Sequence, residues 1–252
     1  MTATLALIGG TGFNQWEGLQ TEERREILTP YGPASAPLLR GRLGDAAVWF
    51  LARHGEGHRI PPHAINYRAN LWALREVGVT RVIAIAAVGA IAADFPPGAI
   101  ALPHDLIDYT WGREHSYADG RPGSGLQHVE LSAPYAPALR QALLAAATRS
   151  GTSCLDGGVM AVTQGPRLET PAEIRRLRQD GATMVGMTGM PEAALAAELG
   201  LAYACLAVSV NWAAGLSPAG AGIHDEIHQS LATGMDRVRR VLAAALPSLV
   251  AA

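Results

Sequence analysis

The stretch "VIAIAAVGAIAA", Val82 to Ala93, decides the fold that this sequence can adopt. It carries no charged residue, yet it is only twelve residues long. A helix that crosses a bilayer needs about 20 apolar residues, so this run is too short to span a membrane. We therefore interpret it as a buried strand followed by its turn.

Helical and extended patterns alternate on both sides of this strand. Residues 64–78 form a helical pattern that ends at Gly78, and apolar strands are expected earlier, within residues 4–10 and 47–55. Residues 182–187 and 201–210 are two more strands, residues 191–200 form a helix between them, and residues 224–246 form a last helix.

The segment "ETPAEIRRLRQDG", residues 169–181, carries a clear helix start signal. Thr170 can cap the helix, Pro171 suits its first turn, and Glu173 completes a capping box. Gly181 is expected to end the helix.

Apolar strands between helices predict a sheet that is covered on both faces, hence an α/β fold. No internal repeat or low-complexity linker divides the chain. The Pro- and Gly-rich residues 118–125 are typical of a long surface loop. We expect residues 1–252 to form a single domain.

Composition narrows the possible functions. The chain is 49% hydrophobic and 17% charged, which favours a sizeable core. A net charge of −2 gives no basis for binding nucleic acid or an anionic membrane surface. Cys154 and Cys205 make no disulfide framework, and the N-terminus has no basic region before its short apolar run. We expect a cytoplasmic protein.

Glycine-rich or polar motifs follow five of the expected strands. In an open α/β sheet, ligands bind outside the carboxyl ends of the strands, so we expect these motifs to converge on one site. They are "GGTG" (9–12), "RHG" (53–55), "VGA" (88–90), "MTGM" (187–190) and "NWAAG" (211–215).

The first motif indicates an anion site. Gly9, Gly10 and Gly12 flank Thr11 and would let backbone N–H groups turn toward an anion, while Thr11 adds a hydroxyl. A plain tight turn explains the glycines equally well. The dinucleotide fingerprint is not met, because Gln15 stands where its last glycine would be.

Arg53, His54 and Thr188 strengthen the case for an anion. The planar fork of an arginine suits phosphate oxygens, and the neighbouring imidazole can donate as well. Alternatively, Arg53 is a rim residue paired with a carboxylate, and Thr188 is a helix cap. Together with Thr11, these residues predict a pocket for one phosphate group. Because no Walker lysine is present, hydrolysis of nucleoside triphosphates is disfavoured.

Glu169 and Asn211 have the chemistry to recognise a heterocycle. A carboxylate accepts from N–H, and a carboxamide donates and accepts side by side. That pair complements a ring that presents an N–H, a carbonyl and a ring nitrogen. Alternatively, Glu169 compensates a helix dipole beside Thr170, and Asn211 is a turn residue at a strand end.

At this point the sequence resembles a known family over nearly its whole length, the trimeric purine nucleoside phosphorylases and methylthioadenosine phosphorylases. The resemblance implies one α/β domain around a central twisted mixed sheet, partly barrel-like and flanked by helices. It implies a homotrimer and the reversible phosphorolysis of a purine nucleoside with inorganic phosphate, with no metal and no other cofactor. The segments that carry it are "IGGTGF" (8–13), "LARHGEGHRIPPHAINYRANLWAL" (51–74), "TQGPRLET" (163–170) and "MVGMTGMPEAALAAELGL" (184–201).

By position, the resemblance implies that Thr11, Arg53, His54 and Thr188 are phosphate ligands. Ala86 occupies a position where the family often has a phosphate-binding threonine, so that contact is expected to be backbone only.

The resemblance also implies which residues lie near the ribose and the base. Met187 matches the residue that packs under the sugar, and Leu168 replaces an aromatic that lies against the base. His58 and His128 match residues near the 5′ end, and His128 is one that the family lends across a subunit interface.

The base end separates two subfamilies. Enzymes for 6-aminopurines have two aspartates where this sequence has Asn211 and Ala213. Enzymes for 6-oxopurines have asparagine at the first position and a glutamate after the "GP" turn, which is Glu169 here. The resemblance therefore implies that Glu169 accepts from the purine N1–H and that Asn211 binds N7 and O6. Asn211 is expected to stabilise charge that builds on the leaving purine.

Outside the base end, the sequence is most similar to the methylthioadenosine phosphorylases. A 6-oxopurine base end combined with this similarity resembles the members of the family that act on S-methyl-5′-thioinosine. We expect this nucleoside to be the substrate. His224 matches a histidine that binds a 5′-hydroxyl in some inosine phosphorylases, so inosine or guanosine is the first alternative and methylthioadenosine the second.

Two functions of other classes are the alternatives to a phosphorylase. His224 and His228 stand at i and i+4, as in zinc metalloproteases, but Asp225 replaces the glutamate of that motif and no third ligand segment follows. We therefore expect no metal site. A non-catalytic nucleoside-binding module would need the base pocket but not Thr11, Arg53 and Thr188.

Overall fold

The computed structural model describes residues 4–12, 19–120, 125–217 and 223–251, with the backbone alone at 223–226, 228 and 251. The helices and strands are, in chain order, β1 (Leu5–Gly9), β2 (Gln20–Arg25), β3 (Leu38–Leu43), β4 (Ala46–Ala52), the short 3₁₀ helix η1 (Pro62–Ala64), α1 (Tyr67–Glu76), β5 (Arg81–Ala90), β6 (Ile100–Leu102), β7 (Asp105–Asp108), α2 (Pro137–Arg149), β8 (Leu155–Asp156), β9 (Val159–Val162), α3 (Pro171–Gln179), β10 (Met184–Gly186), α4 (Gly189–Glu198), β11 (Ala202–Trp212) and α5 (Ile223–Ala251).

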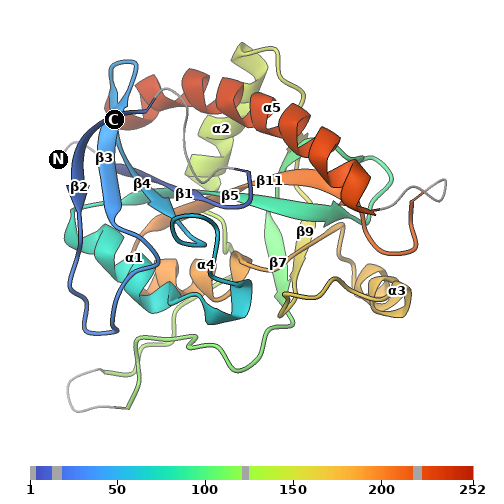
Figure 1. The fold of residues 1–252 in the computed structure, drawn as a ribbon, viewed down its shortest axis with the longest axis horizontal. Coiled ribbons are helices and arrows are strands. Elements are labelled where there is room, and N and C mark those ends of the chain that lie inside the picture. The colour runs from blue at the N-terminus through green and yellow to red at the C-terminus, as the bar shows by residue number, and fades with distance from the viewer. Residues whose placement is uncertain (1–3, 13–18, 121–124, 218–222, 252) are drawn as a thin grey trace.

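Strand β5, which contains most of the opening apolar run, is the centre of a mixed sheet (Figure 1). The main path of the sheet runs β2-β3-β4-β1-β5-β10-β9-β7. Strand β5 also pairs in parallel with β11 over nearly its full length, and β11 continues to β6 and β8. Because β5 pairs with three strands, the sheet branches there instead of forming one open layer.

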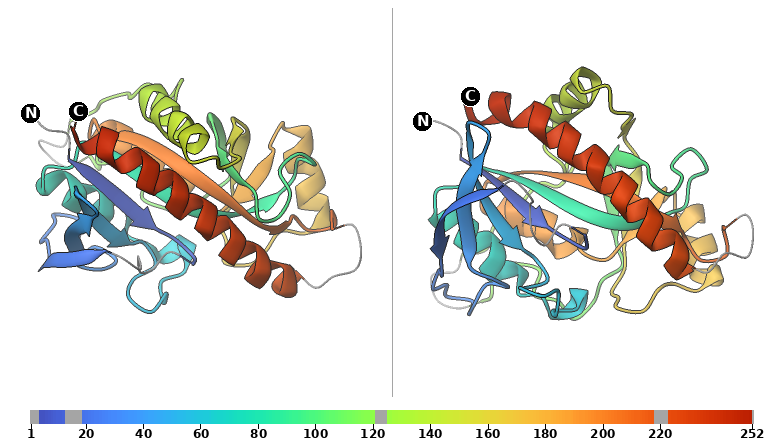
Figure 2. Two further views of the ribbon diagram at one scale, coloured as in Figure 1. Left: turned by 90° about the horizontal axis from the view of Figure 1, so that it is seen from above. Right: turned by 45° about the horizontal axis from the view of Figure 1, so that its top comes forward.

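Helices cover both faces of the sheet, as Figure 2 shows for α5 and α2 on one side. Leu5 and Leu7 of β1 point toward the core layer that α2 and α5 close. Ala6 and Ile8 point the opposite way, into the layer that α1 and α4 close. Every residue of β1 is buried, as expected for a strand with both faces covered.

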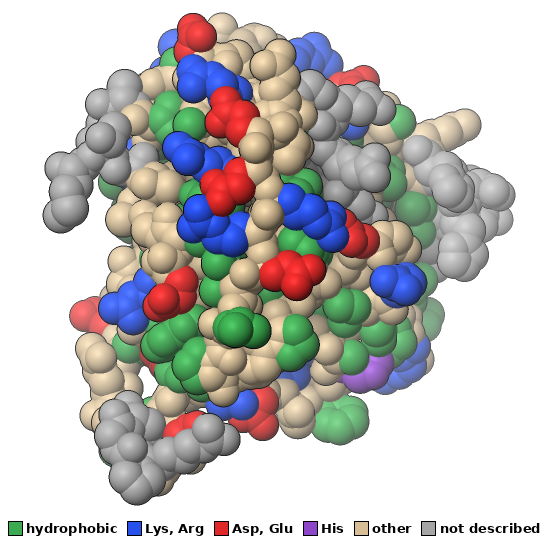
Figure 3. All heavy atoms as spheres, turned by 60° about the vertical axis from the view of Figure 1, so that its left-hand side comes forward, with side chains coloured by type: hydrophobic (Ala, Val, Ile, Leu, Met, Phe, Trp, Pro, Cys, Tyr) green, Lys and Arg blue, Asp and Glu red, His purple; other side chains and the backbone are tan. Residues whose placement is uncertain are grey.

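The outer strand β2 is an exception, since its side chains are mostly exposed. Glu23 and Arg25 of β2 form an ion pair, and Arg24 pairs with Glu56 at 2.5 Å. On the face in Figure 3, acidic and basic side chains are interspersed. Charged side chains on an edge strand discourage pairing with another sheet.

The expected α/β class, with a mixed central sheet flanked by helices, is confirmed. The predicted capping box is also confirmed: the Thr170 hydroxyl accepts from Glu173 N, and the Glu173 carboxylate accepts from Thr170 N. Among the described residues, no helix is long and apolar enough to cross a membrane.

Two details of the predicted arrangement are wrong. Residues 88–90 and Asn211 do not follow their strands but lie inside β5 and β11, which continue through them. Strand β10 runs antiparallel to β5, so its carboxyl end does not point to the same edge as that of β5. Sequence patterns mark where a strand is apolar, but they do not mark its direction.

Candidate active site

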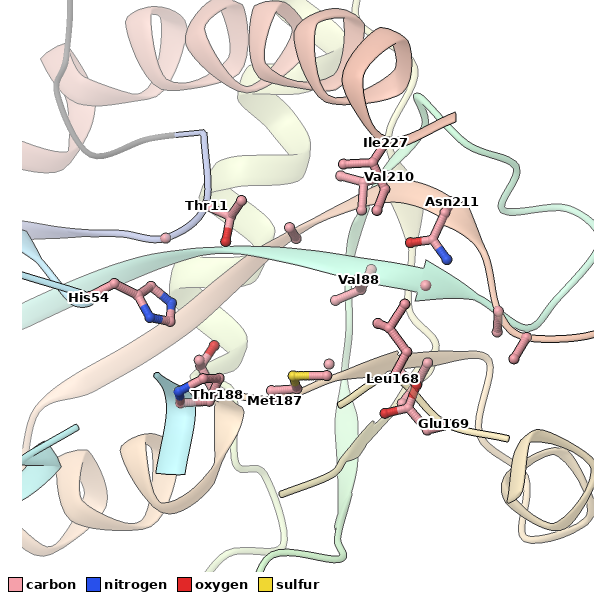
Figure 4. Close-up of a pocket in the computed structure, with 18 of the residues that line it drawn as sticks. Thr11, His54, Val88, Leu168, Glu169, Met187, Thr188, Val210, Asn211 and Ile227 are labelled. Atoms are coloured by element: carbon pink, nitrogen blue, oxygen red, sulfur yellow. The ribbon is translucent and has the colours of Figure 1, made fainter. Parts of the chain in front are cut away.

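A cavity of about 200 Å³ lies where residues from all five predicted motifs meet. In Figure 4, Thr11, His54 and Thr188 lie at one end, and Leu168, Glu169 and Asn211 lie at the other. The motifs therefore converge even though β10 is reversed. The cavity is lined by Gly10, Thr11, Arg53, His54, Pro62, Ala87, Val88, Gly89, Leu168, Glu169, Val185, Gly186, Met187, Thr188, Val210, Asn211, Ala213, Ala214 and Ile227.

The parallel pairing of β1 with β4 brings the first two motifs together. Gly9 is in register with Ala52, and the backbone N–H of Arg53 donates to Gly9 O at 3.0 Å. A Cβ on Gly10 would lie 2.6 Å from Ile85 O and 3.0 Å from Arg53 Nη1. Position 10 therefore requires glycine, because the turn after β1 passes directly over the arginine and over β5.

Arg53 is buried with a carboxylate partner that sequence reasoning missed. Its Nε donates to Glu192 Oε2 at 2.7 Å, its Nη2 donates to Oε1 at 2.8 Å, and its Nη1 donates to Ile85 O at 3.1 Å. Arg53 is 1% exposed and Glu192 is fully buried. The alternative that Arg53 lies at the rim of the site is therefore wrong. Its second part is confirmed, because Arg53 does pair with a carboxylate.

This ion pair sets the charge of the phosphate end. Burial acts to lower the pKa of Arg53, but the Glu192 carboxylate outweighs it and holds the pKa above its ordinary value. The Tyr203 hydroxyl donates to Glu192 Oε1 at 2.8 Å. A sequence signal for Glu192 does exist, because it is the one charged residue of the otherwise apolar segment 189–197.

His54 is 5% exposed, and a backbone carbonyl fixes its ring, with Nδ1 lying 2.8 Å from Ile60 O. Burial, the Arg53 charge and the nearby His58 ring lower the pKa of His54 to about 4, although the Ile60 carbonyl acts to raise it. The imidazole is therefore neutral near pH 7. His54 lines the cavity, and its role as a phosphate ligand stays a prediction.

Thr188 and Met187 follow β10 and lie beside each other in the cavity. Thr188 is the N-cap residue of α4, yet its side chain makes no capping hydrogen bond. The capping alternative is therefore wrong, and the Thr188 hydroxyl, which is 8% exposed, remains available to the cavity.

A β-bulge aims Asn211 into the site. Strand β11 pairs Ser209 with Val88 and Asn211 with Gly89, so Val210 is an extra residue. Neighbouring side chains normally alternate between faces, but the bulge places both Val210 and Asn211 against the cavity. Asn211 Nδ2 donates to Trp212 O at 2.6 Å, which orients the carboxamide and leaves one Nδ2–H and Oδ1 for a ligand.

Glu169 is held at the base end by a residue that the sequence analysis did not single out. The Thr163 hydroxyl donates to Glu169 Oε1 at 2.6 Å. The loop between them is anchored at the start of α3, where Arg167 pairs with Glu173 at 2.7 Å. Glu169 takes no part in the capping box of α3, which uses Thr170 and Glu173.

Arg113 was also missed, because its segment carries no recognisable pattern. It is 9% exposed and donates to four backbone carbonyls, those of Thr163, Gln164, Met187 and Met190. One side chain therefore links the loop after β9 to the loop after β10. Burial lowers the pKa of Arg113.

Three of the expected site residues, Ala86, His58 and His128, do not line the cavity. Ala86 does not line the cavity, because its side chain faces a core layer, and Ala87 lines it instead. His58 lies beside the cavity, with its Nε2 3.5 Å from Thr11 Oγ1. His128 is exposed and does not line the cavity. The side chains of His224 and His228 fall outside the described residues.

Comparison with known proteins adds three findings. The Phosphorylase superfamily pattern matches residues 4–247. A protein of Xanthomonas campestris pv. campestris named "Probable S-methyl-5'-thioinosine phosphorylase" is 53% identical over 215 residues, which cover 85% of this chain and 86% of that protein. A "Probable 6-oxopurine nucleoside phosphorylase" of Dictyoglomus turgidum is 39% identical and covers 97% of this chain and 91% of its own length.

A solved structure agrees with these sequence matches. Methylthioadenosine phosphorylase from Schistosoma mansoni in complex with adenine superposes with a TM-score of 0.91 at 31% identity. The match covers 98% of this chain and 92% of that chain.

Proposed function

This chain belongs to the Phosphorylase superfamily, and we propose that it catalyses phosphorolysis of a 6-oxopurine nucleoside, S-methyl-5′-thioinosine. The bond from C1′ to N9 breaks and a bond from C1′ to a phosphate oxygen forms. Hydrogen phosphate and the nucleoside give hypoxanthine and 5-methylthioribose 1-phosphate. The proton of hydrogen phosphate ends on the purine, so charge and atoms balance.

One observation carries this proposal: the groups suited to phosphate and those suited to a purine line opposite ends of a single cavity (Figure 4). Thr11, Arg53 and Thr188 offer donors at one end. Glu169 and Asn211 offer an acceptor and a carboxamide at the other. Met187 and Val88 lie between them, where the sugar would lie.

The base end supports a 6-oxopurine. The Glu169 carboxylate, which Thr163 holds in place, would accept from the purine N1–H. A 6-aminopurine has no hydrogen at N1, so the carboxylate would face a bare ring nitrogen. A site built to pair such a hydrogen rejects the analogue that lacks it by a factor of about 10⁴–10⁵.

Asn211 supports catalysis as well as recognition. As the glycosidic bond breaks, negative charge builds on the leaving purine, and the remaining Nδ2–H of Asn211 can donate toward N7. Because that charge develops only in the transition state, the interaction accelerates the chemical step.

Val210 and Ile227 line the cavity with apolar side chains beside Asn211, and we place the methylthio group of the substrate against them. A second candidate, inosine or guanosine, is favoured by the similarity to the protein named for 6-oxopurine nucleosides. Methylthioadenosine is the third, and it finds no support in Glu169 and Asn211.

We also propose a cytoplasmic homotrimer that needs no metal. His128 is exposed and lies away from the cavity, and Leu126 beside it is 78% exposed. An interface there would cover the leucine and bring His128 to the 5′ end of a neighbouring protomer's site. Light scattering coupled to gel filtration tests the assembly, and activity in the presence of EDTA tests the metal requirement.

The deciding experiment is phosphorolysis of methylthioinosine, inosine, methylthioadenosine and adenosine, each with and without phosphate. We expect base release only with phosphate, and fastest from methylthioinosine. Faster base release from inosine than from methylthioinosine would support the recognition of a 6-oxopurine base. It would also mean that the site binds a 5′-hydroxyl instead of a 5′-methylthio group. Fastest base release from methylthioadenosine would contradict the roles of Glu169 and Asn211. Base release without phosphate would contradict phosphorolysis itself.

A further inference from the structure

The loops that follow β9 and β10 carry groups from both ends of the cavity. The loop after β9 leads to Glu169, and the loop after β10 carries Met187 and Thr188 (Figure 4). The two strands pair in parallel as far as Gly186, and Thr163 N then donates to Gly186 O at 2.8 Å. Beyond this point the strand pairing no longer sets the distance between the two loops, so side chains must set it.

The guanidinium of Arg113 bridges the two loops, and each of its terminal nitrogens serves one of them. Nη2 donates to the carbonyl oxygens of Thr163 and Gln164, at 3.3 and 2.8 Å. Nη1 donates to the carbonyl oxygens of Met187 and Met190, at 2.9 and 2.5 Å. The planar fork of an arginine keeps its two terminal nitrogens at a fixed spacing, so the carbonyls of one loop are held relative to those of the other.

Other contacts at the same place strengthen this bridge. Arg113 Nε donates to Gln164 Oε1 at 3.2 Å, and the same oxygen accepts from the backbone N–H of Trp111 at 3.2 Å. Arg113 is 9% exposed, and hydrogen bonds from a charged donor are stronger than those between neutral groups. The loops also touch directly, since a Cβ on Gly165 would lie 2.5 Å from Met187 Sδ.

The two loops hold groups that act on different parts of the substrate. Thr163, whose carbonyl accepts from Arg113, donates its hydroxyl to Glu169 at 2.6 Å at the base end. Met187, whose carbonyl also accepts from Arg113, lines the cavity beside Thr188 of the phosphate end. A movement of one loop would therefore change the distance between the bound base and the bound phosphate.

We propose that Arg113 is a positioning residue for phosphorolysis, which holds the loop that carries Glu169 at a fixed distance from the loop that carries Thr188. The inference rests on the proposed function. The attacking phosphate oxygen reaches C1′ of the nucleoside only if both loops keep their places. Arg113 does not line the cavity, so it acts through the two loops and not on the substrate.

Arg113→Lys is the variant that tests this role. A lysine keeps the positive charge, but its single nitrogen cannot replace both ends of the fork. We expect kcat to fall about 10- to 100-fold, because a displacement of the reactants by about 1 Å has an effect of that order. The KM for phosphate should change less than about threefold, because Thr11 and Arg53 follow β1 and β4 and are not held by these loops.

Arg140→Lys is the matched control. The side chain of Arg140 is 11% exposed, and its Nη2 donates to the carbonyl oxygen of Leu102 at 2.9 Å, but it does not line the cavity. Urea denaturation and steady-state kinetics with methylthioinosine and phosphate are measured for both variants. Both should lose some stability, and only Arg113→Lys should lose kcat. An arginine that merely stabilised the fold would lower the denaturation midpoint and leave the kcat of the folded enzyme unchanged.

Gln164→Met keeps the inference falsifiable if Arg113→Lys does not fold. Methionine has a similar shape but offers no amide oxygen to Arg113 Nε, and Gln164 does not line the cavity. The four hydrogen bonds from Arg113 to backbone carbonyls stay in this variant. We expect kcat to fall about three- to tenfold, as for the loss of one hydrogen bond, with the KM for phosphate unchanged.

Three outcomes would overturn the inference while phosphorolysis itself stands. One is a folded Arg113→Lys or Gln164→Met variant with the wild-type kcat. Another is an equal fall of kcat in Arg140→Lys and Arg113→Lys. The third is a rise in the KM for phosphate as large as the fall in kcat, which would mean that Arg113 supports the binding of phosphate and not its position. Absence of any phosphate-dependent base release from the wild type would instead contradict the proposed function.

Discussion

The two ends of the cavity are built in different ways. At the phosphate end, Arg53 is almost fully buried and donates three hydrogen bonds, two of them to Glu192, which is itself fully buried. At the base end, Glu169 is half-buried, with one hydrogen bond from Thr163, and Asn211 donates one to the neighbouring backbone.

Because of this difference, we expect the phosphate end to contribute to stability and the base end to selectivity. The phosphate end is part of the core, since its ion pair joins the residue that follows β4 to α4, and Tyr203 of β11 donates to its carboxylate. The base end is carried by a loop and by a bulge, which can change without unfolding the core. Changes at the phosphate end should therefore cost stability, and changes at the base end should alter selectivity.

The largest effect is expected from Glu192→Ala. Removal of the carboxylate leaves the Arg53 charge buried without its partner, which lowers the free energy of unfolding by about 3–5 kcal/mol. Urea denaturation measures this loss. Asp236→Asn, which breaks the exposed pair with Arg239, is the control and should cost less than about 1 kcal/mol. Equal losses of unfolding free energy in the two variants would mean that the buried ion pair is no more important for stability than the exposed one.

Asn211→Asp should leave stability nearly unchanged and reduce turnover of 6-oxopurine nucleosides. An ionised aspartate cannot donate toward N7 and repels the charge that builds there, so kcat/KM should fall by about 10²–10³-fold, with some 6-aminopurine substrate admitted. Steady-state kinetics with methylthioinosine and methylthioadenosine measure both changes. Asn66→Asp, at the N-cap of α1, should keep the wild-type substrate ranking. Wild-type turnover and selectivity in Asn211→Asp would mean that Asn211 does not contact the base.

Thr163→Val should act through Glu169. A hydrogen bond to a charged group contributes about 1.5–3 kcal/mol, so its loss should reduce the preference for 6-oxopurine over 6-aminopurine roughly 10- to 100-fold. Thr163→Ser keeps the hydroxyl and should restore the preference. If Thr163→Val and Thr163→Ser show the same ratio of kcat/KM values, the hydroxyl does not position the carboxylate.

The smallest effect concerns pH. The folded protein holds the pKa of His54 at about 4, below its ordinary 6.5. Between these values the unfolded chain binds a proton that the folded chain does not, so stability falls as the pH is lowered through this range. From pH 6.5 to 5 the His54 contribution is on the order of 1 kcal/mol. His54→Asn should show a shallower decline in urea denaturation, and an identical slope would argue against a neutral, buried His54.

The sequence predicts the local chemistry of the site well. Thr11, Arg53 and Thr188 can be recognised because each stands in a short motif after an apolar strand, and all line the cavity. Their partners are harder to find. Glu192 lies 139 positions from Arg53, and nothing in either segment says that the two will meet. Thr163 looks like an ordinary residue at a strand end until its hydroxyl is seen 2.6 Å from Glu169.

By itself, the sequence determined the α/β class, the central strand within residues 82–93 and several residues that line the cavity, because apolar runs, glycine turns and functional groups are local properties. Only the tertiary structure decided the antiparallel direction of β10, the bulge that turns Asn211 into the cavity and the compensation of Arg53 by Glu192. It also decided the surroundings of His54, which is buried with its Nδ1 2.8 Å from the Ile60 carbonyl oxygen. The direction of a strand, its register and the protonation of a buried group depend on contacts with residues that are distant in the chain. Those contacts form only when the protein folds.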